Sequence, residues 1–247
     1  LVWTREDDTN AGYFRPMYFH KLRAGLDSNG KIIAWQHKII GQSIMSGSVY
    51  AAFITDGIDS SSVEGATSLP YNIPNFEVQL KTVESQVPVL WWRSVGSTHT
   101  AYSTEVFMDE LAAAAGQDPL AFRRAHLSDD PRYKAVLDLA IEKSGWGSAL
   151  PANRSRGVAI HKSFGSYVAQ VAELVVDDKG QYKGDRVVCA VDCGVAINPD
   201  IIRAQMEGGI GYGLSPALMS EITINNGAVA ESNFDTHNVV RMRDMPE

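Results

Sequence analysis

Three pairs of an Asx residue and a proline constrain this chain most, because each marks the start of a helix: Asp118-Pro119, Asp130-Pro131 and Asn198-Pro199. An Asp or Asn side chain accepts hydrogen bonds from the first free amides of a helix. Proline suits the first helical position because its missing N–H has no partner to lose there. An apolar-periodic run follows each pair, so we predict helices that begin at all three.

The block 103–147 is therefore predicted to be helical, with one more helix ahead of the first two Asx-Pro pairs. Ser103 is the predicted cap of that helix, and Glu105 lies in its first turn, near the positive end of the helix dipole. Gly116 and Gly145 are predicted to end helices. The residues that we expect to form buried faces are Phe107, Leu111 and Ala114 in the first helix, and Val136, Leu137, Ala140 and Ile141 in the third.

Strands are predicted on both sides of this helical block. Residues 1–88 read mainly as strands, with a hairpin around Asp27–Gly30, a loop-like stretch over 46–75, and the N-terminal "LVWTREDD" as the end of a strand. Residues 156–193 return to strands, and a last hairpin is predicted at Asn225–Gly227. Because strands and helices come in blocks, we predict an α+β fold of mixed strand and helix lobes. The first lobe is expected over 1–150 and the second over 151–247.

Composition narrows the class of partner. The 247 residues are 45% hydrophobic, enough for a sizeable core, and the net charge of −7 argues against nucleic acid or an anionic membrane as the main partner. No apolar run reaches the roughly 18 residues that a membrane-spanning helix needs. Both ends read as cut, so we expect a piece of a longer parent protein. Its compartment stays open between bacterial cytoplasm and periplasm.

The two cysteines, Cys189 and Cys193, lie four residues apart in a predicted strand. Four strand residues span about 13 Å, whereas a disulfide needs Cα atoms roughly 4.4–6.8 Å apart. We therefore predict no disulfide, and two buried side chains on one strand face. No further Cys or His pair has the spacing of a metal site.

The predicted helix after Pro199 carries four glycines within six residues: Gly208, Gly209, Gly211 and Gly213. Each glycine inside a helix costs about 1 kcal/mol relative to alanine, so helix propensity does not explain them. Close approach of the backbone to another element or to a ligand would. Gln205, one turn earlier, can donate and accept hydrogen bonds at the edge of a heterocycle, or it can be an ordinary surface residue.

The stretch "WWRSVGSTHT" places an arginine between two tryptophans and a run of small residues. Arg93 can pair with a buried carboxylate. It can also form an anion clamp with the backbone amides of residues 94–98, to which Thr98 and His99 add polar contacts. A serine hydrolase built on Ser97, His99 and a carboxylate is a weaker alternative.

Three blocks in order along the chain resemble the molybdenum-cofactor subunit of the xanthine dehydrogenase and aldehyde oxidase family, and most of all the isoquinoline 1-oxidoreductase beta-subunit type. They are "WRSVGSTHTAYSTEVFMDELA", "RGVAIHKSFGSYVAQVAEL" and "VDCGVAINPDIIRAQMEGGIGYGLSPALMSEI". With "WTREDD" and "SNFDTHNVVRMRDMPE", the resemblance covers nearly the whole chain.

The resemblance implies a molybdenum hydroxylase in which a molybdopterin-type cofactor holds the metal and no side chain ligates it. In that family a molybdenum-bound hydroxide attacks a small N-heterocycle or aldehyde, a hydride passes to the metal centre, and electrons pass to an iron–sulfur small subunit. The cofactor-binding residues that it implies here are Arg93, Ser94, Val95, Gly96, Gln205, Gly208 and Gly209. The catalytic glutamate is expected beyond Glu247, so no catalytic residue is expected within the chain. The rival reading is a non-catalytic binding or assembly module.

Several positions depart from the family pattern. The family places Gly where Ser94 stands, an aromatic residue where Val95 stands, and Pro-Gln where Thr98-His99 stand. A cofactor segment that most members insert between the strands of the second lobe is expected before Leu1, as in the isoquinoline type. We therefore expect the isolated chain to fold but to lack activity and cofactor.

Overall fold

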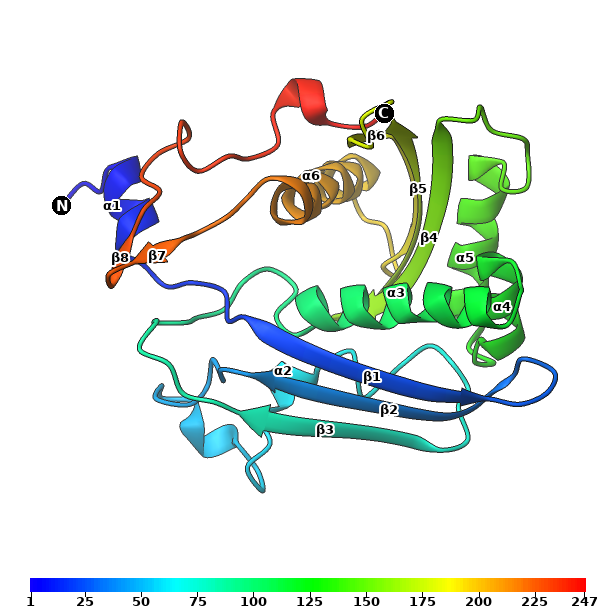
Figure 1. The fold of residues 1–247 in the computed structure, drawn as a ribbon, viewed down its shortest axis with the longest axis horizontal. Helices are drawn as coiled ribbons and strands as arrows, with labels where there is room; N and C mark the ends of the chain where they lie inside the picture. Colours follow the sequence, from blue (N-terminus) through cyan, green and yellow to red (C-terminus); the bar gives the residue numbers. More distant parts are fainter.

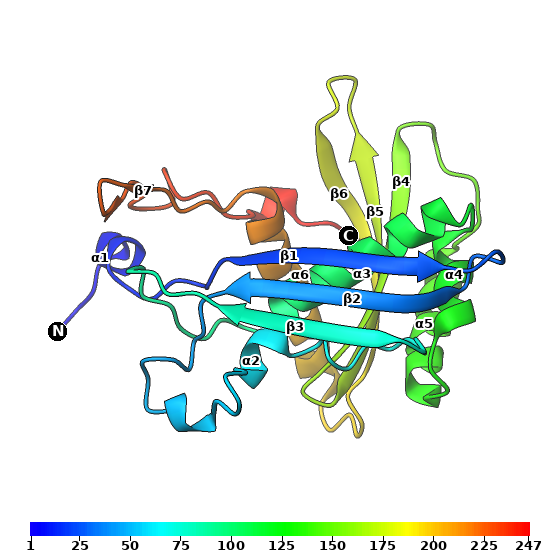
Figure 2. The ribbon, with the colours of Figure 1, turned by 60° about the horizontal axis from the view of Figure 1, so that its bottom comes forward.

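Two three-stranded sheets, set crosswise, frame the structure, a computed structural model that describes residues 1–247 (Figures 1 and 2). In the first sheet β1 (Tyr18–Leu26) pairs antiparallel with β2 (Ile32–Gly41), and β3 (Phe76–Thr82) adds to β2 in parallel. The β1–β2 turn is the predicted one. The Asp27 carboxylate accepts hydrogen bonds from the amides of Asn29 and Lys31, and Gly30 takes a positive φ of 77°.

The second sheet is an antiparallel meander of β4 (Arg154–Ser163), β5 (Ser166–Val176) and β6 (Tyr182–Asp192). Phe164 and Gly165 form the first turn, both at positive φ. The predicted return to strands after the helical block is confirmed, and with it the α+β class.

The helical block consists of α3 (Ser97–Ala114), α4 (Pro119–His126) and α5 (Pro131–Ser144) (Figure 1). Both Asx-Pro starts are confirmed, since the side chains of Asp118 and Asp130 accept hydrogen bonds from the first helical amides. Gly145 ends α5 in the left-handed conformation, as predicted.

The predicted start of α3 is wrong. The helix begins six residues earlier, at Ser97, and Ser103 is a buried residue within it whose hydroxyl donates to the Thr100 carbonyl. The predicted apolar stripe is also wrong in part, because Ala114 is exposed. The buried face runs instead through polar residues before it becomes apolar: Ser97, Thr100, Ser103, Thr104, Glu105, Met108, Leu111 and Ala112.

Short helices occupy two regions that were expected to be strand or loop. The N-terminus forms α1 (Arg5–Asn10), since Thr4 and Asp7 build a reciprocal capping box. The stretch predicted as a loop contains a 3-10 turn (Ala51–Phe53) and α2 (Ser60–Val63), which Asp59 caps through the Ser61 amide. A second 3-10 turn (Met242–Asp244) precedes the C-terminus, which pairs with β6 through Val187 and Glu247.

The third Asx-Pro pair starts α6 (Pro199–Leu218), as predicted, with the Asn198 side chain accepting from two amides. The hairpin β7 (Ile224–Asn225) and β8 (Ala228–Val229) follows, at its predicted position. Unlike the other long helices, α6 has no buried residue along its 20 positions.

One core cluster joins both sheets and helices α3 to α5. It contains Ile32 and Trp35 from the first sheet, Leu137 from α5, and Ile160 and Val171 from the second sheet. The ranges 1–150 and 151–247 therefore share a core, and the division into lobes at residue 150 stays a prediction.

The cysteine prediction is confirmed for pairing and wrong for burial. Both thiols are free. Cys189 lies half-buried on β6, where Gln170 donates to its sulfur, but Cys193 falls beyond the end of the strand and is exposed.

Candidate cofactor-binding site

The loop Trp91–Gly96, which leads into α3, combines exposed aromatic rings with strained backbone. Trp91 and Trp92 are 37% and 41% exposed, and Arg93 is exposed as well. Ser94 and Val95 adopt φ values of 65° and 48°. A branched residue such as valine rarely adopts positive φ, and strain of this kind accumulates at functional loops.

Arg93 reaches across to α6. Its guanidinium carbon lies 3.9 Å from the centroid of the Tyr212 ring, and the Trp92 ring lies 6.4 Å from the same ring. No carboxylate pairs with Arg93, so the alternative of a buried ion pair is wrong. The loop and the glycine-rich helix, more than 100 residues apart in sequence, are thus neighbours in space.

Three of the four glycines of α6 face open space. A Cβ atom added at Gly208, Gly209 or Gly213 would meet nothing within 4 Å, and only Gly211 approaches another segment, at Met245. Packing within the chain therefore does not explain Gly208 and Gly209. Gln205, on the same helix, is exposed, so its amide is available to a group outside the chain.

Three of the five backbone amides expected to form an anion clamp, those of Val95, Gly96 and Thr98, are bonded within the chain. The Gly96 amide donates to the Glu64 carboxylate at 3.1 Å, and those of Val95 and Thr98 donate to carbonyls of the loop itself. Gly96 is glycine for a packing reason, because a Cβ there would lie 2.0 Å from the Ser61 carbonyl oxygen. The guanidinium of Arg93 is exposed and donates to no protein acceptor.

Behind the loop, three histidines from three elements form a chain of imidazoles. His99 Nδ1 lies 3.1 Å from His20 Nε2, and His20 Nδ1 lies 2.8 Å from His37 Nε2. Burial lowers the pKa of His20 and His37 to about 4 and that of His99 to about 3. The three rings are therefore neutral at pH 7. They do not converge on one point, and no group of His, Cys, Asp or Glu is arranged to hold a metal ion.

The sequence analysis missed this histidine chain, although one of its two contacts, between His20 and His37, follows from the predicted hairpin. The β1–β2 register places Leu22 opposite His37, so His20 and His37 are diagonal neighbours across the hairpin. The hairpin prediction alone brings these two together. Nothing local indicates that His99 joins them.

The hydrolase alternative finds no support in this arrangement. The Ser97 hydroxyl is buried without a hydrogen-bond partner, and His99 contacts His20 and stacks on Tyr18 with ring centroids 3.8 Å apart. A serine nucleophile needs a base within hydrogen-bond reach, and none is bonded to Ser97.

A buried carboxylate fixes the helix that follows the loop. Glu105 accepts hydrogen bonds from the Arg123 guanidinium at 3.0 Å, the Tyr71 hydroxyl at 2.7 Å and the Ile160 amide at 2.9 Å. Arg123 is fully buried and also contacts Asp109. The prediction that Glu105 lies in the first turn is wrong. It joins α3, the helix that follows the Arg93 loop, to α4 and β4.

Comparison with known proteins points to one family. Residues 79–246 and residues 1–127 each match a sequence profile described as a molybdopterin cofactor-binding domain. Isoquinoline 1-oxidoreductase subunit beta of Brevundimonas diminuta is 31% identical over 254 residues, across 100% of this chain and 32% of that protein. The membrane-bound aldehyde dehydrogenase [pyrroloquinoline-quinone] of Gluconacetobacter polyoxogenes is 27% identical, across 100% of this chain and 35% of that protein.

Among solved structures, quinoline 2-oxidoreductase from Pseudomonas putida 86 superposes with a TM-score of 0.82 at 10% identity, across 100% of this chain and 56% of that one. This likeness is one of fold. The chain spans about a third of the length of the two curated relatives named above. None of its helices is both long and apolar enough to cross a membrane.

Proposed function

Because the chain belongs to the molybdopterin cofactor-binding domain family, we propose that its parent protein is a molybdenum hydroxylase that oxidises an N-heterocycle or an aldehyde. In this proposal the chain forms part of the large subunit. The names of the two curated relatives, an isoquinoline oxidoreductase and an aldehyde dehydrogenase, support these two substrate classes.

The proposal rests on one observation, the contact between the Arg93 loop and α6. Arg93 offers guanidinium N–H groups that no protein acceptor occupies, and it lies against Tyr212 of the helix on which three of the four glycines face open space. A flat cofactor fits such a surface, because backbone without side chains allows close approach. When bound, the cofactor supplies a two-electron redox centre.

In this arrangement the residues of the chain bind and orient rather than transfer protons. Arg93 and Gln205 would hold polar edges of the cofactor, and Gly208 and Gly209 would let α6 approach it. Ser94, Val95 and Gly96 would set the position of Arg93. Trp91 and Trp92 would exclude water from one side. Glu64, the carboxylate nearest to the loop, accepts a hydrogen bond from the Gly96 amide, and in this proposal the catalytic glutamate comes from another part of the parent protein.

An iron–sulfur small subunit is the proposed electron acceptor. Support for an assembly of subunits comes from the curated relative that is itself named a beta subunit. We infer the iron–sulfur partner from the reaction class, because oxidation of a heterocycle or aldehyde releases two electrons that a one-electron carrier can accept in turn.

The test is to purify the parent protein, measure molybdenum by elemental analysis, and assay dye reduction with N-heterocycles and aldehydes. The proposal predicts about one molybdenum per chain and substrate-dependent reduction. A folded parent without molybdenum or turnover would favour a non-catalytic binding or assembly module. Ester hydrolysis that Ser97→Ala abolishes would favour the hydrolase instead.

A further inference from the structure

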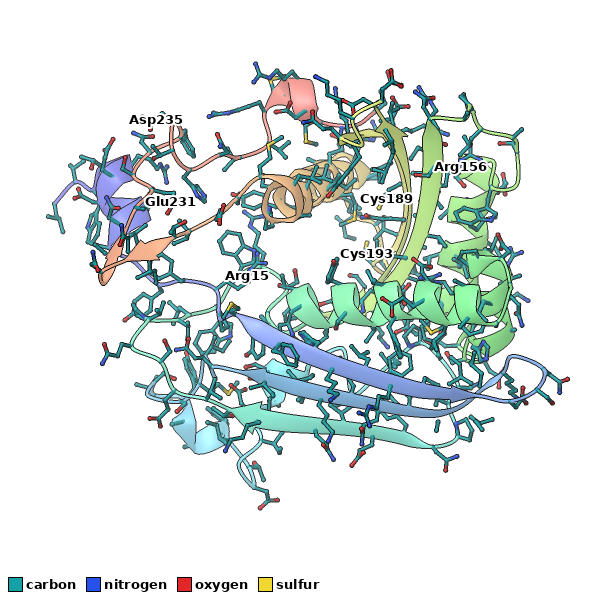
Figure 3. The ribbon with its side chains drawn as sticks, viewed as in Figure 1. Arg15, Arg156, Cys189, Cys193, Glu231 and Asp235 are labelled. Carbon is teal, nitrogen blue, oxygen red and sulfur yellow. The ribbon has the colours of Figure 1, made fainter.

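Two arginines and two aromatic rings form a stack between the N-terminal part of the chain and α6. The guanidinium carbon of Arg15 lies 4.7 Å from the centroid of the Trp92 ring. Trp92 is next to Tyr212, whose ring carries the guanidinium of Arg93 on its face. We call these four residues the Arg–aromatic stack. Figure 3 shows Arg15 in the opening between α6 and the N-terminal end of α3.

Neither guanidinium of the stack has an acidic partner. Eight other arginines form ion pairs in this acidic chain, namely Arg5, Arg123, Arg124, Arg132, Arg154, Arg156, Arg186 and Arg243. Arg15 and Arg93 form none, and neither side chain donates a hydrogen bond to a protein acceptor. Burial lowers the pKa of Arg15, and no carboxylate acts against this effect. A half-buried cation without a counter-charge is costly, so its position requires a reason.

Each guanidinium of the stack contacts an aromatic ring and bonds no protein acceptor, so its N–H groups are available to a ligand. A guanidinium that stacks on a ring uses its face, while its N–H groups point outward in the plane. This planar fork matches two oxygens of a carboxylate or phosphate. Trp92 and Tyr212 stay 41% and 48% exposed, so they are not core rings whose packing alone would explain the arginines.

The size of the cavity next to the stack limits where a ligand can lie. A cavity lined by Arg15, Trp92, Val95, Gly96 and His99 has a volume of about 10 Å³. That volume holds about one water molecule and no larger group. A ligand therefore has to sit on the open side of the stack, where the exposed rings offer a flat apolar surface beside the two cations.

We propose that the Arg–aromatic stack binds an anionic oxygen group, a carboxylate or a phosphate, carried by a flat molecule. Arg15 and Arg93 bind the anion, and Trp92 and Tyr212 contact the ring system. The proposal rests on the proposed function in one respect, the molecule that carries the anion. That anion is either a carboxylate of the substrate or a phosphate of the cofactor. It adds Arg15, which no sequence pattern indicated, to the candidate binding residues.

The experiment compares the wild-type parent protein with Arg15→Gln, Arg93→Gln and the double variant by calorimetric titration at low salt. The titrated probes are benzoate and its neutral analogue benzamide, which test binding of a substrate carboxylate. The amount of pterin retained after purification is measured as well, and it tests binding of a cofactor phosphate. The matched control is Arg23→Gln, because Arg23 is exposed on β1 and also lacks an acidic partner. Melting temperatures verify that each variant folds, and Arg15→Met and Arg93→Met, which also remove the charge, replace any glutamine variant that does not.

Hydrogen bonds to charged groups are stronger than those between neutral groups, so each glutamine variant should weaken binding of the affected ligand about tenfold or more. Weakened benzoate binding identifies a substrate carboxylate, and pterin loss identifies a cofactor phosphate. Arg23→Gln and benzamide binding should not change. The proposal is overturned if the Arg15 and Arg93 variants match Arg23→Gln in both readouts, or if the wild type neither binds benzoate nor retains pterin. Molybdenum and dye reduction in the wild type test the proposed function separately.

Discussion

Replacing Glu105 with alanine should destabilise the protein strongly, because three donors converge on this one buried carboxylate. The side chains of Glu105 and Arg123 are 7% and 0% exposed. The substitution leaves the Tyr71 hydroxyl and the Ile160 amide without their acceptor, and it removes from Arg123 the more buried of its two carboxylate partners, since Asp109 is 44% exposed. Burial raises the pKa of Tyr71 well above its usual range, so its hydroxyl stays protonated and loses a bond as well.

Breaking a buried ion pair by removing one partner costs about 3–5 kcal/mol. We expect a loss of this size in the free energy of unfolding, measured by urea denaturation. The matched control is Glu110→Ala on the same helix, where the side chain is exposed and bonded to nothing, and where we expect a change within about 0.5 kcal/mol. Glu105→Gln, which keeps the shape and one acceptor, should fall between the two. A cost below about 1 kcal/mol for Glu105→Ala would show that the network does not hold α3 in place.

Two further predictions concern the loop and the histidines behind it. Arg93→Ala should lower dye-reduction turnover of the parent protein without lowering its melting temperature, since Arg93 is exposed and pairs with no carboxylate; undiminished turnover would make Arg93 dispensable. Burial lowers the pKa of His20, His37 and His99 in the folded state, so below pH 6.5 the unfolded chain binds more protons than the folded one. The stability that is present above pH 6.5 should therefore be lost as the pH falls toward 4. The loss is at most about 1.4 kcal/mol per histidine and pH unit. Urea denaturation between pH 7 and 4 should show a shallower loss for His20→Gln than for His237→Gln, and equal slopes would contradict the burial argument.

The sequence predicted best where a local signal decides the structure. Asp118, Asp130 and Asn198 cap helices through their own side chains, and the Asp27 turn bonds within five residues. Each of these features is complete within a few positions of the chain. Their prediction therefore needed no knowledge of the tertiary fold.

The sequence failed where distant contacts override local preference. Ser103 looked like a helix cap because of its residue type, yet α3 starts at Ser97, where Gly96 packs against the Ser61 carbonyl. Glu105 looked like a residue of the first turn, although Arg123, 18 positions away, decides its burial. No spacing rule relates these residues.

The candidate site was predicted in part. The resemblance indicated Arg93 and α6 together, and the contact between Arg93 and Tyr212 brings them into proximity. It did not indicate Arg15, because its ring partner, Trp92, lies 77 positions away. The roles of Ser94, Val95, Gly96, Gln205, Gly208 and Gly209 at a cofactor stay predictions.

The most direct test of the cofactor surface on α6 is the molybdenum and pterin content of the parent protein with Gly209→Leu. Space around Gly209 is open within the chain, so the added side chain should not lower the melting temperature, but it would occupy the place of a cofactor. Ala217→Leu, at an exposed position near the end of the same helix, is the matched control. We predict about one molybdenum per chain in the wild type and the control, and loss of most molybdenum and pterin in Gly209→Leu. Full occupancy in Gly209→Leu would contradict the placement of the cofactor on this helix.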